Sequence, residues 1–306
     1  MKPSFAFISL NQKIARLIPL WTQGAGSNLS EKISDKKMLI KASGFRLDQV
    51  TQDTGFVELN YHQLKDLLLI NASQPKSEQE AFYSEALMTS KFQTQNSLRP
   101  SMEAGFHALS KYKFVLHFHS LAAVLMGAHP EWMKANHLYL IPLVNPGWEL
   151  SQFFIKNDSE LNILMNHGVI LQSNTEGILQ KWDQLENSFL AEFNYSLLLS
   201  LKKKITTTHQ YLNQPDLASF LKGPLKFYFP DMAIYFQKLK PFLIPDNVEY
   251  TSYTLSPEAN TDLQELWIAT QILFQSNPQL TEMPETMIES ITKLPTEKLR
   301  QTFIKG

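Results

Sequence analysis

Cysteine is absent from this chain of 306 residues. Its absence excludes disulfide scaffolds, thiol catalysis and zinc sites built from cysteine thiolates. A surplus of charge is missing too, because 28 lysine and arginine residues are balanced by 29 aspartate and glutamate residues, for a net charge of -1. A chain so balanced has no broad basic surface, so we expect neither nucleic acid nor an anionic membrane as a partner.

Long hydrophobic runs are also missing. The most apolar stretch, residues 114–127, is interrupted by histidines and is shorter than the ~20 residues that a membrane span requires. The first residues lack the charged start, apolar run and small-residue cleavage site of a signal peptide. We therefore expect a cytoplasmic protein. What the chain does have is 43% hydrophobic and 11% aromatic residues, enough to bury a substantial core.

Helical and extended patterns alternate through roughly the first 220 residues, which predicts an α/β fold. The expected strands cover residues 28–33, 38–42, 114–120, 138–144 and 161–165. The expected helices cover residues 10–21, 61–70, 77–89, 100–111, 121–127 and 176–201. The last of these begins with acidic residues and ends in three lysines, a charge order that suits the helix dipole.

The pattern changes after a polar stretch around residues 213–216. An aromatic segment, residues 225–236, then precedes a largely helical tail that includes residues 262–274 and 284–291. We therefore expect two parts. The first is a domain over residues 1–220, and the second is a mostly helical C-terminal extension, residues 221–306, packed on the core.

The sharpest local pattern is Leu116-His117-Phe118-His119-Ser120. Side chains along a strand alternate between its two faces, so His117 and His119 would point the same way and Phe118 the opposite way. Two imidazoles placed like this can bind one metal ion. They can equally be a coincidental pair of buried, hydrogen-bonded histidines, and the pattern alone does not decide between the two.

His167 and Glu103 extend this candidate site. His167 stands beside Gly168, directly after an apolar strand pattern, and three neutral imidazoles with a fourth position open are typical of a catalytic zinc site. Taken alone, a histidine beside a glycine is better interpreted as a turn residue. Glu103 lies one turn before His107 on an expected helix, so its carboxylate could be a ligand or a general base. Taken alone, it is better interpreted as a partner of the helix dipole.

Together these motifs resemble the class II aldolase/adducin family. The resemblance rests on GAGSNLS, KASG, PSMEAGFHAL, VLHFHS and NHGVILQSNTEGI, which follow one another in the family's order. It is closest to the branch of rhamnulose-phosphate aldolase-like domains fused to a dehydrogenase, where the spacing from the glutamate to the histidine pair looks the same. We expect no fused dehydrogenase here, because the tail lacks a G-x-G-x-x-G motif.

The resemblance implies a fold and a metal site. The fold would be an α/β/α layered domain on a mainly antiparallel central sheet, assembled as a homo-oligomer, often a tetramer. One divalent metal ion would be held by His117, His119 and His167, with zinc as the default and manganese, iron or cobalt as alternatives. Glu103 matches the family's catalytic acid/base.

The resemblance also implies a substrate. It would be a sugar phosphate or related ketose, cleaved in a retro-aldol reaction through a metal-stabilised enediolate. Small residues in three loops would hold its phosphate without an arginine: Ser27, Asn28, Ser43, Gly44 and Ser101. Two positions depart from the family. Ser27 stands where a glycine is usual, and Met102 replaces a hydroxyl residue of fuculose-phosphate aldolase-like members. No catalytic tyrosine can be assigned.

Other functions stay open at this point. Epimerisation, dehydration and decarboxylation use the same kind of metal site within the family. A non-catalytic adducin-like assembly module is an alternative from a different class, although adducins lack the metal histidines. Keeping four dispersed polar residues in apolar surroundings is costly without a use, so the sequence favours an enzyme.

Overall fold

A seven-stranded sheet forms the centre of the molecule, in the order β3-β2-β1-β4-β7-β6-β5. The computed structural model describes residues 2–92, 98–208, 226–236 and 257–294. The strands are β1 (Asn28–Lys32), β2 (Lys37–Lys41), β3 (Phe56–Asn60), β4 (Phe114–Phe118), β5 (Tyr139–Ile141), β6 (Leu161–Leu164) and β7 (Gly168–Ser173). All neighbours pair antiparallel except β5 and β6, so the mainly antiparallel sheet expected from the sequence is confirmed.

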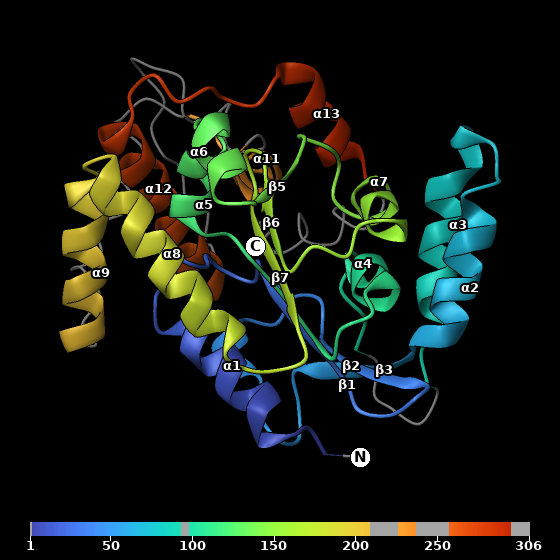
Figure 1. Cartoon of the computed structure of the whole chain (residues 1–306). Helices are drawn as coiled ribbons and strands as arrows, with labels where there is room; N and C mark the ends of the chain where they lie inside the picture. Colours follow the sequence, from blue (N-terminus) through green and yellow to red (C-terminus); the bar gives the residue numbers. More distant parts are fainter. Residues whose placement is uncertain (1, 93–97, 209–225, 237–256, 295–306) are drawn as a thin grey trace.

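Helices cover both faces of this sheet (Figure 1). One face carries α2 (Tyr61–Asn71), α3 (Lys76–Thr89), α4 (Ala104–Leu109), α7 (Trp148–Gln152) and the 3-10 turn η2 (Phe153–Ile155). The other carries α1 (Phe5–Ala15), η1 (Leu47–Gln49), α5 (Leu121–Met126), α6 (Pro130–Ala135), α8 (Ile178–Glu192) and α9 (Ser196–Thr208). This arrangement is the expected α/β/α layering. Among the described helices, none is both long and apolar enough to cross a bilayer.

Three helices of the C-terminal region join the second layer. They are α11 (Pro230–Phe236), α12 (Pro257–Ser276) and α13 (Glu285–Lys293). Their buried side chains, including Met232, Leu266 and Ile288, belong to the same hydrophobic cluster as those of α1, α5 and α8. The polar stretch expected around residues 213–216 and the start of the aromatic segment lie outside the described residues.

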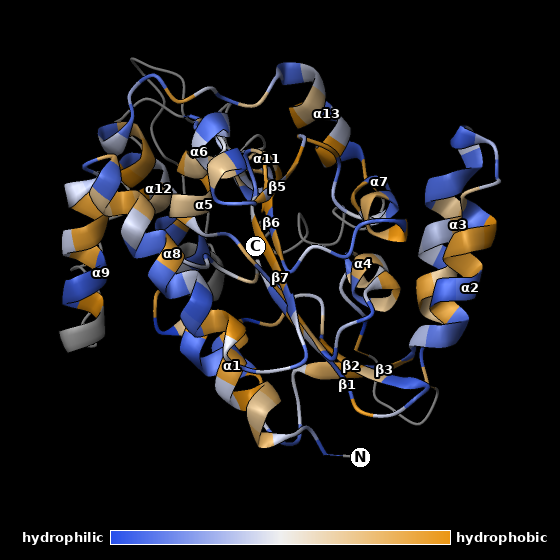
Figure 2. Cartoon of the chain, in the orientation of Figure 1, coloured by the Kyte–Doolittle hydropathy of each residue, from blue (hydrophilic) through white to orange (hydrophobic). Residues whose placement is uncertain are grey.

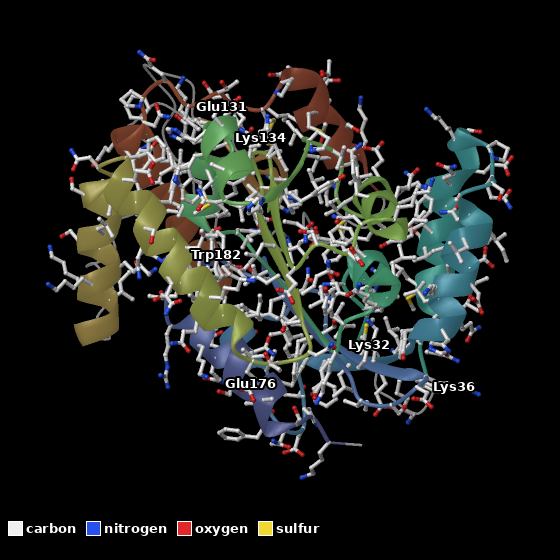
Figure 3. All side chains as sticks on the ribbon, in the orientation of Figure 1. Lys32, Lys36, Glu131, Lys134, Glu176 and Trp182 are labelled. Carbon is white, nitrogen blue, oxygen red and sulfur yellow. The ribbon has the colours of Figure 1, made fainter. Side chains whose placement is uncertain are left out.

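The sheet separates two hydrophobic cores because its strands alternate. On β4, Leu116 and Phe118 face the core that contains the fully buried Trp182 of α8, which Figure 3 labels, whereas Val115 faces the core under α2, α3 and α4. Apolar residues accordingly dominate the inner sides of the helices (Figure 2). Five buried residues in a row on β4 fit a strand that is covered on both faces.

The structure differs from the sequence-based expectations at several boundaries. Strands β3 and β7 were not predicted, although β7 pairs with β4 at the centre of the sheet. The helix expected over residues 100–111 is only α4, with Glu103 as its N-cap residue instead of a member of its first turn. The single helix expected over residues 176–201 is two helices, α8 and α9. Asn194, between them, has φ 55°, a left-handed conformation that ends α8.

A buried ion cluster fastens α12 to the loop after β2. The Arg46 guanidinium contacts Asp262 at 2.5 Å and Glu265 at 2.7 Å, and all three side chains are at most 15% exposed. Burial raises the pKa of Asp262 to about 6, whereas the charge of Arg46 beside it acts in the opposite direction and favours the ionised carboxylate. Glu265 also accepts a 2.8 Å hydrogen bond from the backbone N–H of Gly24. The C-terminal region is thereby tied to the loops around Gly24 and Arg46.

This cluster generates a stability prediction. Arg46→Ala should lower the free energy of unfolding by about 3 kcal/mol, because two largely buried carboxylates would lose their common cation. Chemical denaturation would measure the change, and Arg16→Ala, at an exposed position on the same side of the sheet, is the control. A loss below about 1 kcal/mol, as for a surface ion pair, would contradict the proposed importance of the cluster.

Candidate functional site

Two histidines meet where the central strand β4 ends. His117 lies within β4, opposite Asn28 of β1 and Ile170 of β7. His119 lies one residue past the end of the strand, just before Ser120, whose hydroxyl caps α5 by accepting from the backbone N–H of Ala123. Both rings are buried, and their centroids are 5.0 Å apart. The expected juxtaposition of the two imidazoles is therefore present although the strand is shorter than expected.

His167 completes the group from the neighbouring hairpin. It lies in the turn between β6 and β7, after Asn166, which has a left-handed φ of 53°. The ring centroid of His167 lies 4.7 Å from that of His117 and 5.0 Å from that of His119. One nitrogen from each ring lies within 4.8 Å of the others, a spacing that one metal ion could bridge. The three histidines singled out in the sequence thus form one cluster.

The state of His117 suits a metal ligand. Its Nδ1 donates to the carbonyl oxygen of Val169 at 3.0 Å, so Nε2 carries the lone pair. Burial lowers the pKa of His117 below its ordinary value, which keeps the ring neutral. Nε2 is buried and has no hydrogen-bond partner among the described residues. Buried polar atoms are rarely left unpaired, so the donor set fits a divalent cation.

Glu103 faces this cluster from the loop before α4. Its Oε2 lies 3.4 Å from His117 Nε2, and its Oε1 lies 3.8 Å from His167 Nε2. Asn28 Nδ2 donates to Oε2 at 2.7 Å, whereas Oε1 is buried without a hydrogen-bond partner in the described part of the chain. One carboxylate oxygen is therefore fixed and the other is available to a cation, a substrate or a proton.

A buried hydrogen-bond chain orients Glu103. Burial lowers the pKa of His107 well below its ordinary value, so the ring is neutral and has one donor and one acceptor nitrogen. His107 Nε2 contacts Oδ1 of Asn28, which can only accept, and His107 Nδ1 lies 2.7 Å from the hydroxyl of Ser30, which can donate to it. The sequence drew attention to His107 only as a helical neighbour of Glu103. Its position shows that it supports Asn28, which in turn holds the carboxylate.

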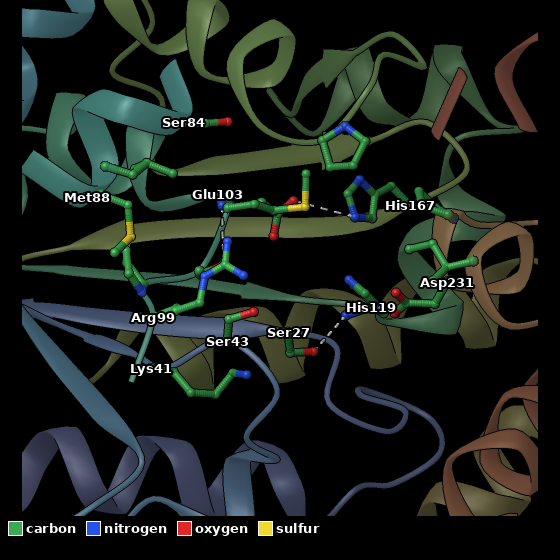
Figure 4. Close-up of a pocket in the computed structure, with 17 residues that line it drawn as sticks. Ser27, Lys41, Ser43, Ser84, Met88, Arg99, Glu103, His119, His167 and Asp231 are labelled. Atoms are coloured by element: carbon green, nitrogen blue, oxygen red, sulfur yellow. Dashed lines mark hydrogen bonds and ion pairs between the residues drawn. The ribbon is translucent and has the colours of Figure 1, made fainter. Parts of the chain in front are cut away.

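A cavity opens beside the histidines (Figure 4). Its volume is about 920 Å³, open mouth included, and its wall contains Glu103, His119 and His167. Three of the five residues expected to bind phosphate, Ser27, Ser43 and Ser101, also line it, and so does Met102. Asn28 and Gly44 are not among the lining residues. The Asn28 amide is committed to Glu103 and His107, and Gly44 is exposed with φ 82°.

Two cationic side chains line the same cavity, and sequence reasoning missed both as site residues. Lys41 and Arg99 lie on the wall beside Ser43 (Figure 4). Lys41 Nζ donates to the carbonyl oxygens of Ala25 at 3.1 Å and Phe45 at 2.5 Å, so it joins the two small-residue loops. The expectation of an anion pocket without an arginine does not match this wall. A signal was present in the sequence, since Lys41 begins the KASG motif and Arg99 directly precedes Pro100-Ser101.

Asp231, from the C-terminal extension, was also missed. It lies in the first turn of α11, lines the cavity, and places Oδ2 2.9 Å from His119 Nδ1. The available signal was a single acidic residue inside the otherwise apolar run from Phe227 to Phe236. Pro230 and Ile234 of the same segment line the cavity as well. The extension thus contributes directly to the wall of the site.

Several solved structures of other proteins are similar to this chain. Solved structures with a similar fold include the N-terminal class II aldolase domain of a conserved protein from Thermoplasma acidophilum, with 22% identity, a TM-score of 0.46, and coverage of 56% of this chain and 84% of that one. A candidate aldolase/epimerase/decarboxylase from Escherichia coli has 16% identity, a TM-score of 0.42, and coverage of 61% and 89%. L-fuculose-1-phosphate aldolase from Thermus thermophilus has 13% identity, a TM-score of 0.41, and coverage of 64% and 95%.

The family assignment rests on the sequence match. No curated protein matches the chain. The model of the class II aldolase and adducin N-terminal domain, however, matches residues 10–175, more than half of the chain. This range contains the three histidines, Glu103 and the small-residue loops, and it ends before the C-terminal extension begins. The chain therefore belongs to the class II aldolase/adducin family.

Proposed function

We propose that the protein is a metal-dependent lyase that cleaves a carbon–carbon bond of a sugar phosphate or related ketose. The observation that carries this proposal is the position of Glu103, whose unpartnered Oε1 faces the three-histidine cluster on the wall of an open cavity. A divalent cation held by His117, His119 and His167, with zinc as the default, would act as a Lewis acid toward the negative charge that bond cleavage leaves.

Glu103 would move the proton. Asn28 and His107 fix one of its oxygens, so the other can be held toward the carbon that gains a proton after cleavage. Glu103 is only 6% exposed, so water competes poorly for that proton. In the reverse direction the same oxygen would remove the proton and allow the two fragments to join.

Lys41 and Arg99 support an anionic substrate. Both lie beside Ser43 at the end of the cavity away from His167 and Asp231 (Figure 4), and Ser101 lines the same cavity. An arginine can form two parallel hydrogen bonds to a phosphate, and serine hydroxyls add donors of suitable geometry. We infer that the phosphate of the substrate is held at this end while its carbonyl end approaches the histidines. Ser27, Asn28 and Gly44, from the small-residue loops, remain predicted to contribute to phosphate binding.

The remaining sequence-based expectations stay predictions. They include the nearness to the rhamnulose-phosphate branch, a homo-oligomeric state, a cytoplasmic location and the division between residues 1–220 and 221–306. Epimerisation, dehydration and decarboxylation are alternative reactions for the same groups. A non-catalytic assembly module is the alternative from a different class. It predicts no turnover that depends on the metal, and no role for Oε1 of Glu103.

The first prediction from this proposed function concerns metal content. The purified protein should carry about one divalent metal ion per chain, and the double variant His117→Ala, His119→Ala should lose most of it, because a single remaining imidazole binds a cation weakly. Elemental analysis of the native protein measures this, with His62→Ala, an exposed histidine on α2, as the control. Full metal retention in the double variant would refute the site.

The second prediction concerns Glu103. Glu103→Gln should keep the metal but lower kcat by about 10²- to 10⁴-fold, because the amide cannot exchange a proton. Aldehyde release from a panel of ketose phosphates measures turnover, and Glu160→Gln, a partly exposed acid paired with Lys181, is the matched control. Loss of metal together with turnover would make Glu103 a ligand instead, and unchanged turnover would remove it from the mechanism.

The third prediction concerns the anion. Inorganic phosphate should bind beside Ser43 and Ser101, and Arg99→Ala should weaken it by about ten- to a hundredfold, the loss of a charge-assisted hydrogen bond. Calorimetric titration measures the affinity, and Arg16→Ala controls for net charge. If an unphosphorylated ketose is turned over while phosphate binds to neither protein, the substrate lacks the phosphate.

A further inference from the structure

The C-terminal extension places one acidic side chain against the histidine cluster. Asp231 is 2% exposed, and its Oδ2 lies 2.9 Å from Nδ1 of His119. It lies outside residues 10–175, the range shared with the family model. The contact therefore belongs to a part of this chain that the family domain does not include.

The backbone leaves room for this contact at Gly26. A Cβ atom at that position would lie 2.6 Å from Asp231 Oδ2 and 2.8 Å from His119 Nδ1, closer than real Cβ atoms approach other atoms. Only glycine allows the carboxylate and the imidazole to meet over this loop. The site thus depends on three segments that are distant in the sequence: the loop before β1, the end of β4 and the start of α11.

Packing holds Asp231 in place. Its neighbours Phe229 and Met232 are buried, and the hydroxyl of Thr270 on α12 lies 3.1 Å from the sulfur of Met232. The backbone N–H of Met283 donates to the carbonyl oxygen of Phe227 at 2.8 Å. Helix α12 is itself fastened to the loop after β2 through Arg46. The carboxylate is presented by a helix that is anchored on two sides, so it can orient another group.

A carboxylate beside Nδ1 selects one form of His119. The two atoms are at hydrogen-bonding distance without being in line, so the interaction is first of all electrostatic. Negative charge at this point favours the tautomer with its proton on Nδ1, which leaves the lone pair on Nε2. His117 has the same tautomer, with the proton on Nδ1 and the lone pair on Nε2, because the carbonyl oxygen of Val169 accepts from Nδ1. Histidine ligands commonly donate their second N–H to such an acceptor.

We propose that Asp231 is a positioning residue of the metal site, which holds His119 in its ligating tautomer and orientation. The C-terminal extension then sets the metal affinity of the family domain in this protein. The proposal rests on metal binding by the three histidines, as argued above, and adds a residue that acts through one of them.

The test is the metal affinity of Asp231→Asn and Asp231→Ala in the full chain. Zinc dissociation constants, measured by competition with a chromogenic chelator, should rise by about ten- to a hundredfold in Asp231→Ala, the usual cost of losing such an acceptor. Asp231→Asn should lose less, because its amide oxygen keeps partial negative charge beside Nδ1 although the full charge of the carboxylate is gone. Glu282→Gln, another acid of the extension that pairs with Lys226 near the surface, is the matched control.

Spectroscopy separates positioning from ligation. With cobalt in place of zinc at saturating concentration, the visible absorption of Asp231→Asn should match that of the parent, because the ligand set is unchanged. A shifted spectrum would make Asp231 a ligand and overturn the positioning role. Equal zinc affinity in parent and variants would overturn it as well. If the parent itself binds no zinc, the metal site proposed above fails, an outcome distinct from either of these.

Discussion

Strand β4 is hydrogen bonded to β1 on one side and to β7 on the other, and this double pairing determines where the histidines and Asn28 lie. The register with β1 places Asn28 opposite His117, so the amide that holds Glu103 starts beside one of the clustered histidines. The register with β7 sets His117 opposite Ile170, and the turn before β7 carries His167 to the same end of the sheet. A slip of one residue would turn His117 into the core that contains Trp182, and would turn Leu116 and Phe118 out of that core.

Hydrogen bonds link several polar groups around the histidines into a chain. Ser30, His107, Asn28 and Glu103 pair in sequence, and Val169 holds His117. Among the described residues, Glu103 Oε1 and His117 Nε2 are buried without a hydrogen bond, and they belong to groups that converge on one another. A folding unit without chemistry would gain stability by filling these positions with apolar side chains, so their retention argues for a ligand.

Much of the layered fold and the histidine group could be predicted from local patterns. The β1–β2 hairpin, α2, α3 and β4 were expected from their local sequences, and the motifs that contain His117, His119 and His167 follow the family's order. Strand β7 was missed because a short apolar run has no period of its own and becomes a strand through pairing with β4. The end of α8 was missed because Asn194 can adopt a left-handed conformation inside an amphipathic pattern. Asp231, Lys41 and Arg99 were missed because only tertiary packing brings them to the wall of the same cavity.

The C-terminal extension is synthesised after the family domain, and this order determines when the contacts between the two can form. The family domain can pair its strands as soon as β7 has emerged, whereas α11 and α12 follow only after a long intervening segment. Contacts between such distant segments form late in folding, because closing a long loop costs conformational entropy before the contacts are made. A nascent chain would therefore expose three histidines before the acidic side chain that accompanies them exists. Docking of α12 on Arg46 would then mark the moment at which Asp231 joins the three histidines.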